Sequence, residues 1–211
     1  MSGNMTLNMT QTPSASVSLK TNPLLAQWLR FEANGSVTVF TGKAELGQGI
    51  LHALKLMAAH ELELPMSQVQ IQAANTQHGP DEGMTSGSLS VQDSGMAIRQ
   101  ACAHAAQLVK THGFASYADL HSIVDPKLPV DVSVAPKFTA LNMTDGRDDI
   151  AALVQGEPIF LHDLGINVDL TPIKNLWHGR MVRGPGLRSS LHVESWAGAL
   201  AALPAGVQAF R

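Results

Sequence analysis

The hydrophobic and polar positions of the chain begin with a strand-like pattern. Residues 28–33 and 36–40 are rich in β-prone side chains, and Asn34-Gly35 lies between them. An Asn-Gly pair suits a tight hairpin turn because both residues tolerate positive φ. The pattern therefore predicts a β-hairpin as the first ordered element, with both central turn residues at positive φ.

Two helical patterns follow, each after a loop that contains glycine. Apolar side chains recur every three or four positions over 50–64, where Pro65 ends the pattern, and again over 91–111, where Gly113 suits the C-terminus. Between them, residues 69–73 alternate as a strand. This order predicts an α+β fold in which two loops present backbone N–H groups near helix N-termini, a place that suits an anion.

The two ends of the chain have a different character. Residues 1–23 are rich in Ser, Thr and Asn and are interpreted as a flexible leader, whereas 123–150 contain three prolines and indicate a linker that crosses the surface. Strand-like patterning resumes at 159–161 and 176–182, and an Ala-rich helix is expected over 196–203. We interpret this last part as the opening of an α+β domain that the chain does not complete.

Composition and charge narrow the range of functions. The net charge is -3 and only 15% of residues are charged, so general nucleic-acid binding is disfavoured. The single cysteine, Cys102, excludes an internal disulfide or a cysteine-based metal site, and its Ala-rich helix indicates a small core residue. No apolar run reaches the roughly 18 residues of a membrane span and no targeting segment is evident, so a cytoplasmic location is expected.

Two short loops are the candidate ligand-binding segments. Gly47-Gln48-Gly49 is either a tight turn before a helix or a place where a ligand approaches the backbone, with Gln48 offering donors and an acceptor. Thr85-Ser86-Gly87-Ser88 is either a Ser/Thr-rich helix cap or a nest of hydroxyl and N–H groups for an oxo or phosphate group. The residues by themselves leave both alternatives open for each loop.

The other polar groups form no recognisable catalytic or metal-binding motif. His52 and His60 lie two helical turns apart, too far for joint ligation, and no G-x-S-x-G elbow supports serine catalysis. The adjacent carboxylates Asp81-Glu82 and Asp148-Asp149 have diverging side chains and are interpreted as solvated surface. No catalytic residue and no protein metal ligand is therefore assigned.

Three motifs, taken in order, resemble a known family. They are GKAELGQGI at 42–50, AHEL at 59–62 and PDEGMTSGS at 80–88. They are similar to the molybdopterin-binding subunit of the xanthine dehydrogenase/aldehyde oxidase (molybdenum hydroxylase) family, and most to its nicotinate dehydrogenase and isoquinoline oxidoreductase branch. The resemblance extends over about residues 25–211.

In that branch a cofactor domain is followed by an a/b hammerhead domain. Residues 147–163 and 176–185 resemble the beginning of the hammerhead. The resemblance therefore implies a partial molybdopterin cofactor-binding domain over 24–122 and a truncated hammerhead over 151–211.

The resemblance also implies a reaction and a cofactor. Members of the family hydroxylate aromatic N-heterocycles (nicotinate-like) or aldehydes with oxygen from water, and the dithiolene of molybdopterin holds the molybdenum, here expected in the cytosine dinucleotide form. Gly47, Gln48 and Gly49 would hold the pterin–molybdenum end, with Gln48 hydrogen-bonding the cofactor. The Thr85–Ser88 segment would approach the oxo ligands or the pterin.

The resemblance implies partners as well. Iron–sulfur clusters are expected only on partner subunits: a 2Fe-2S subunit, with a cytochrome c subunit as a further candidate. A second polypeptide would supply the C-terminal region, and partners would be the route to any association with the inner membrane.

The chain departs from the family at the general base. In the family this is a glutamate near the C-terminus of the full subunit, and no position here corresponds to it. Whether the chain is itself an enzyme is left open. One hypothesis is an N-terminal fragment or split subunit of a molybdenum hydroxylase. The alternative is a non-catalytic binding or assembly module, or a decayed gene fragment that keeps the cofactor loops.

Overall fold

The computed structural model describes residues 14–137, 146–147, 150–157, 186 and 201. The chain divides into two compact units, Met1–Glu157 and Pro158–Arg211, and every helix and strand discussed below lies in the first. The elements expected over 159–161, 176–182 and 196–203 lie outside the described residues, Ala201 excepted, as does most of the expected hammerhead.

The first unit is built on a three-stranded mixed sheet with the order β1-β2-β3. The strands are β1 (Leu29–Phe31), β2 (Val37–Phe40) and β3 (Val69–Gln72). β1 and β2 are antiparallel, which confirms the predicted hairpin, whereas β2 and β3 are parallel. Parallel neighbours need a crossover connection, and α3 (Ile50–Leu62) lies within it. The sheet and its helices confirm the α+β class for this unit.

The hairpin turn differs from its prediction in one respect. Gly35 has a φ of 83°, but Asn34 is not among the residues with positive φ. The Oδ1 atom of Asn34 accepts hydrogen bonds from the backbone N–H and the hydroxyl of Ser36, at 3.0 and 2.7 Å. Because this side chain stabilises the turn from an ordinary backbone conformation, a single glycine at positive φ is sufficient.

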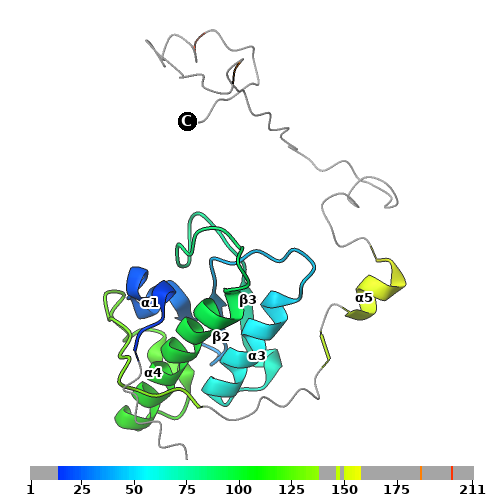
Figure 1. Cartoon of the computed structure of the whole chain (residues 1–211). Helices are drawn as coiled ribbons and strands as arrows, with labels where there is room; N and C mark the ends of the chain where they lie inside the picture. Colours follow the sequence, from blue (N-terminus) through cyan, green and yellow to red (C-terminus); the bar gives the residue numbers. More distant parts are fainter. Residues whose placement is uncertain (1–13, 138–145, 148–149, 158–185, 187–200, 202–211) are drawn as a thin grey trace, which may run out of the picture. The chain divides into compact units, whose positions relative to one another are not determined.

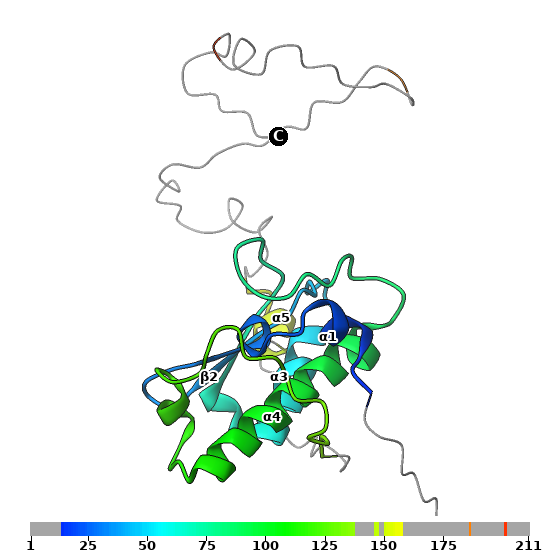
Figure 2. The ribbon, with the colours of Figure 1, turned by 90° about the vertical axis from the view of Figure 1, so that its left-hand side faces the viewer.

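The two longest described helices, α3 (Ile50–Leu62) and α4 (Met96–His112), lie side by side in both ribbon views (Figure 1, Figure 2). The helices are α1 (Val17–Thr21), α2 (Leu25–Trp28), α3, α4 (Met96–His112) and α5 (Ile150–Gln155), with single 3-10 turns at Met66–Gln68 and Tyr117–Leu120. α3 stops before Pro65, and α4 stops at Gly113, which has a φ of 65°, as predicted. Among the helices described, none is both long and apolar enough to cross a membrane.

The helix predicted from residue 91 begins differently from the prediction. Ser90–Gly95 forms a π-helical turn, and the α-helix starts only at Met96. Two side chains of this turn form long-range contacts. Asp93 accepts hydrogen bonds from Ser18, and the Ser94 hydroxyl donates one to Glu82. A local periodicity cannot show such contacts, and π-turns often lie at functional sites.

The core is formed by apolar side chains of the sheet, α2, α3 and α4. Its fully buried members include Trp28, Val37, Leu54 and Ile98. Cys102 is also fully buried, as predicted, and burial raises the pKa of its thiol. A neutral, inert thiol is the consequence.

The predicted leader is wrong over its last part, because residues 14–23 belong to the folded unit. The Ser16 side chain caps α1, and Leu19 is only 2% exposed within the core. The side chain of Gln100 on α4 donates to the carbonyl oxygen of Ser14 at 3.0 Å. The polar composition of this segment therefore reflects capping and tertiary hydrogen bonds.

The predicted linker is held to the same unit over its first half. Backbone hydrogen bonds of 2.8 Å join the N–H of Leu25 to the carbonyl of Leu128 and the N–H of Val130 to the carbonyl of Pro23. Val124 and Val132 also pack against the core. Residues 124–132 therefore follow a fixed course along the folded unit.

Candidate functional site

The two loops singled out from the sequence leave the sheet at the same edge. Parallel strands end on the same side, so the segments after β2 and β3 start next to each other. Backbone hydrogen bonds of 3.1 Å continue the pairing, from Thr41 to the carbonyl of Gln72 and from Ala74 to the carbonyl of Lys43. Figure 1 shows both loops extending from one end of α3 and α4.

Most N–H groups of the first loop are already satisfied by the chain itself, although those of Glu45 and Gln48 have no acceptor among the described residues. Oε1 of Glu45 accepts hydrogen bonds from the N–H groups of Gly47 and Gly49, at 2.8 and 2.9 Å, and Oε2 accepts one from Leu51 at 3.2 Å. The sequence predicts an external anion at this helix N-terminus. In the structure an internal carboxylate holds that position, as the partial positive charge of a helix N-terminus favours.

This contact gives the stability of the loop a pH dependence. Burial raises the pKa of Glu45, but the three backbone hydrogen bonds and the charge of Arg147 outweigh burial, so the pKa lies below its ordinary value of 4.5. A lowered pKa means that the stabilisation is present above pH 4.5 and is lost as pH falls through the folded-state pKa.

We therefore expect Glu45→Gln to lower the free energy of unfolding by about 1 kcal/mol at pH 7, a typical capping contribution. The difference from the unsubstituted chain should shrink below about pH 4, as measured by urea unfolding across the pH range. Glu157→Gln, at an exposed carboxylate, is the control. A difference that stays constant down to about pH 3 would contradict the role assigned to Glu45.

The side chain of Gln48 forms hydrogen bonds within its own loop. Its Oε1 accepts from the N–H of Leu46 at 2.5 Å, and its Nε2 donates to the carbonyl of Ala44 at 3.0 Å. The side chain is exposed. A hydrogen bond from Gln48 to a cofactor stays a prediction; the second N–H of its amide and the second lone pair of Oε1 have no partner among the described residues.

The second loop meets the first and keeps its own donors available. The Thr85 hydroxyl oxygen accepts a hydrogen bond from the N–H of Ala44 at 2.9 Å. Ser86, Gly87 and Ser88 are exposed, and their N–H groups form no hydrogen bond to other residues of the described part of the chain. Of the two loops, the second therefore offers more of the N–H donors that a ligand could use.

A pocket of ≈ 450 Å³ lies between the two loops. It is lined by Leu46, Gln48, Gly49, Ile50, Ala53, Thr85, Ser86, Ser88, Ser90 and Val91. The structure thus brings together five of the seven predicted site residues. The other two, Gly47 and Gly87, are sequence neighbours of lining residues but do not line the pocket themselves. The lining contains hydroxyl, amide and aliphatic groups and no charged side chain, which fits a ring system that carries oxygen atoms.

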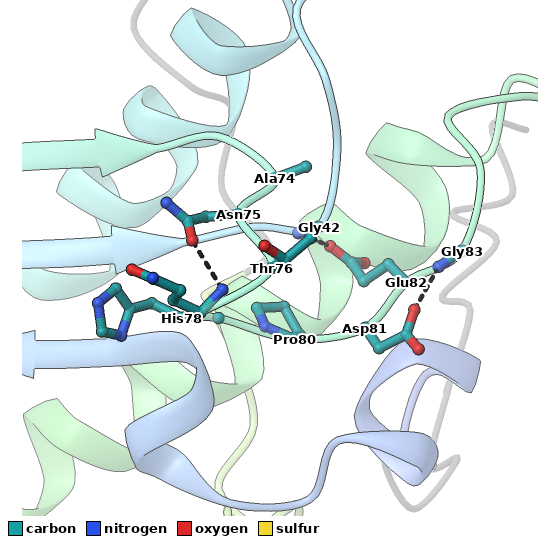
Figure 3. A pocket seen from close by; sticks show the side chains of 11 residues that line it. Gly42, Ala74, Asn75, Thr76, His78, Pro80, Asp81, Glu82 and Gly83 are labelled. Carbon is teal, nitrogen blue, oxygen red and sulfur yellow. Dashed lines mark hydrogen bonds between the residues drawn. The ribbon is translucent and has the colours of Figure 1, made fainter. Parts of the chain in front are cut away.

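A residue of the candidate site that the sequence interpretation missed is Glu82. It was assigned to solvated surface, but its Oε2 atom accepts hydrogen bonds from Thr41, Gly42 and Ser94. Figure 3 shows the carboxylate reaching the backbone of Gly42 beside a pocket of ≈ 470 Å³, lined by Gly42 and residues 74–83. Its position directly before the Gly83–Ser88 segment was the only available signal.

His104 forms a structural contact in the described part of the chain. Within the described ranges, no group of three or more His, Cys, Asp or Glu side chains could hold a metal ion. Nδ1 of His104 accepts a hydrogen bond from the N–H of Asp131 at 3.1 Å. Burial lowers the pKa of His104, which favours the neutral ring that this hydrogen bond requires.

The comparison with known proteins decides the family. A family model described as "Molybdopterin cofactor-binding domain" matches residues 5–125. The chain belongs to this family. The resemblance found in the three sequence motifs is thereby confirmed, and both candidate loops lie inside the matched range.

Individual relatives have limited identity. The chain is 25% identical over 189 residues to a nicotinate dehydrogenase subunit of Pseudomonas putida, and 36% identical over 77 residues to aldehyde oxidase 3 of Rattus norvegicus. It is 35% identical over 69 residues to xanthine dehydrogenase of Blastobotrys adeninivorans. These alignments cover 76%, 36% and 33% of this chain but only 15%, 6% and 5% of the relatives, so the chain spans a small part of their length.

Proposed function

We propose that the chain holds a molybdopterin cofactor between its two loops, as part of a molybdenum-dependent hydroxylase. The observation that carries this proposal is the meeting of the loops: the hydrogen bond from Ala44 to Thr85 closes them around an uncharged pocket of ≈ 450 Å³. The hydroxyl groups of Ser86 and Ser88, together with the N–H groups of that segment, are the donors for its oxygen atoms.

The first loop contributes shape more than donors. Glu45 fixes Gly47 and Gly49 at positive φ, and the Gln48 amide spans the loop. This arrangement lets the backbone approach a ring system while most donors are satisfied internally. When bound, the cofactor supplies the hydroxylation chemistry, in which water provides the oxygen atom.

We propose further that the enzyme oxidises an aromatic N-heterocycle of the nicotinate type, or an aldehyde. The names of the relatives support these two substrate classes. Cofactor in the cytosine dinucleotide form, a 2Fe-2S partner subunit and an a/b hammerhead over residues 151–211 belong to the same proposal. The nicotinate dehydrogenase relative is one subunit of its enzyme, which supports assembly of this chain with other chains.

A binding or assembly module is the second candidate. Four apolar side chains around the loops are exposed: Leu46, Met84, Leu89 and Val91. Exposed apolar groups that gather near one site favour contact with another protein chain. A stable complex with a partner polypeptide that forms equally well without molybdenum would favour this candidate.

The double substitution Ser86→Ala and Ser88→Ala tests the cofactor proposal. The chain is co-expressed with a polypeptide that covers the rest of the nicotinate dehydrogenase relative, and molybdenum per chain is measured by elemental analysis. Each hydroxyl contributes about 0.5–1.5 kcal/mol, so we expect the affinity for the cofactor to fall at least about fivefold and the molybdenum content to fall with it.

Ser67→Ala is the matched control. Ser67 is an exposed serine in the 3-10 turn Met66–Gln68 that precedes β3, so it lies at the opposite end of that strand from the loops. The control should keep the full molybdenum content. Equal contents in the double variant and the control would refute the assignment of the second loop.

A further inference from the structure

One carboxylate oxygen connects three separate segments of the candidate site. Oε2 of Glu82 accepts hydrogen bonds from the Thr41 hydroxyl at 2.9 Å, from the N–H of Gly42 at 2.7 Å and from the Ser94 hydroxyl at 2.9 Å. These donors come from the loop after β2 and from the turn before α4. Hydrogen bonds to an ionised acceptor are about twice as strong as neutral ones.

The surroundings leave this carboxylate little freedom. Thr41 and Ser94 are 1% and 0% exposed, and their hydroxyl oxygens are 3.1 Å apart. The Nζ atom of Lys43, itself 5% exposed, donates to the backbone carbonyl of Glu82 at 3.1 Å. Oε1 of Glu82 is buried as well and takes no hydrogen bond from the described residues. Any other placement of the side chain would break several contacts at once.

The backbone of the first loop at Gly42 approaches the backbone of the second loop closely. A Cβ atom on Gly42 would lie 2.6 Å from the carbonyl oxygen of Pro80 and 2.9 Å from the backbone nitrogen of Glu82. Both distances are too short for a side chain. The approach of the two loops therefore depends on a glycine as well as on the carboxylate.

The loop after β3 is also held from its other side. The Nδ2 and Oδ1 atoms of Asn22 pair with the carbonyl and the N–H of Asp81, both at 2.9 Å. Asn22 is buried, and its backbone carbonyl accepts from the indole N–H of Trp28 at 2.7 Å. The residue next to Glu82 is thus anchored to the core.

We propose that Glu82 is a positioning residue that sets the spacing between the first loop and the Thr85–Ser88 segment before any ligand binds. The role of Glu82 in cofactor binding rests on the proposed function, whereas the hydrogen bonds of Glu82 are observed independently of it. A site whose loops are fixed in advance avoids the entropy cost of ordering them on binding.

Hydrogen exchange of the full chain tests the inference without a cofactor. The amides of Gly42 and Ala44 report directly on the junction, and those of Leu54 and Ala101 report on the core. In Glu82→Ala we expect exchange at Gly42 and Ala44 to accelerate at least about tenfold, the loss of one charge-assisted hydrogen bond, with core exchange changing less than about threefold.

Further variants separate positioning from general stability. Glu82→Gln keeps the size and one acceptor, so it should restore part of the protection, and it carries the test where Glu82→Ala does not fold. Gly42→Ala keeps the carboxylate but separates the loops, and should accelerate the same amides, with Gly146→Ala as control because nothing lies within 4 Å of its added Cβ. Glu32→Gln, another carboxylate that accepts from a threonine hydroxyl, should change neither set of amides.

Two exchange results would overturn the inference: unchanged exchange at Gly42 and Ala44, or equal acceleration at Leu54 and Ala101, which would indicate a core role only. Molybdenum content of the co-expressed protein is the second readout, and Glu82→Ala should lower it several-fold. Equal loading despite accelerated loop exchange would also overturn the positioning role. Absence of molybdenum from the unsubstituted protein would count against the proposed function alone, and the exchange data would still decide the role of Glu82.

Discussion

When this chain is produced alone, we expect it to contain less than about a tenth of an equivalent of molybdenum. Glu45 and Gln48 already satisfy donors of the first loop, so the second loop supplies most of the contacts. Each such hydrogen bond competes with water and contributes about 0.5–1.5 kcal/mol. The nicotinate dehydrogenase relative is also several times longer, since this chain covers only 15% of it.

Co-expression with a polypeptide covering the rest of that relative should raise the content to near one equivalent. Every additional 1.4 kcal/mol or so of contact strengthens binding about tenfold, so the contacts that a second polypeptide adds to the cofactor should change its affinity by several orders of magnitude. Elemental analysis of the purified chain, with and without the second polypeptide, measures this directly. Near-stoichiometric molybdenum in the chain purified alone would contradict the expectation.

The substitution Trp28→Ala should have the largest effect on stability. Trp28 is fully buried, and its indole N–H donates to the carbonyl of Asn22 at 2.7 Å. Removing a buried tryptophan costs about 3–5 kcal/mol, which corresponds to a fall of roughly 10–15 °C in the melting temperature for a chain of this size. Calorimetry or thermal unfolding followed by circular dichroism would measure the change.

Two further variants give this result its interpretation. Trp28→Phe keeps much of the volume but leaves the Asn22 carbonyl without its donor, so an intermediate loss of about 1–3 kcal/mol is expected. Val17→Ala, at a side chain that is 68% exposed, should change stability by less than about 0.5 kcal/mol. A Trp28→Ala variant as stable as Val17→Ala would show that the core does not depend on this side chain.

The candidate site was predictable in its parts and unpredictable in its assembly. The sequence named Gln48, Gly49, Thr85, Ser86 and Ser88, and the structure places all five around one pocket. It did not show that the N–H groups of the first loop receive Glu45, because a carboxylate in a loop has no pattern that separates an internal acceptor from an exposed charge. Glu82 was misinterpreted for the same reason, whereas Asp81 is exposed as expected.

The sequence by itself determined the elements that depend on neighbours along the chain. The hairpin at Asn34-Gly35, the helix stops at Pro65 and Gly113 and the burial of Cys102 follow from local backbone preferences and from the apolar period. The order of its motifs also determined the family, which the match over residues 5–125 confirms.

Only the tertiary structure decided what lies next to what. The parallel pairing of β2 and β3 brings two loops about 40 residues apart to one edge of the sheet, and Glu82 and Asn22 then fix them there. Residues 14–23 are mostly polar along the sequence, yet they fold because Leu19 enters the core and their hydrogen-bond partners lie on α4, in the π-helical turn before it and beside Glu82. Such contacts join residues 40 to 86 positions apart, and a pattern that extends over a few helical turns carries no information about them.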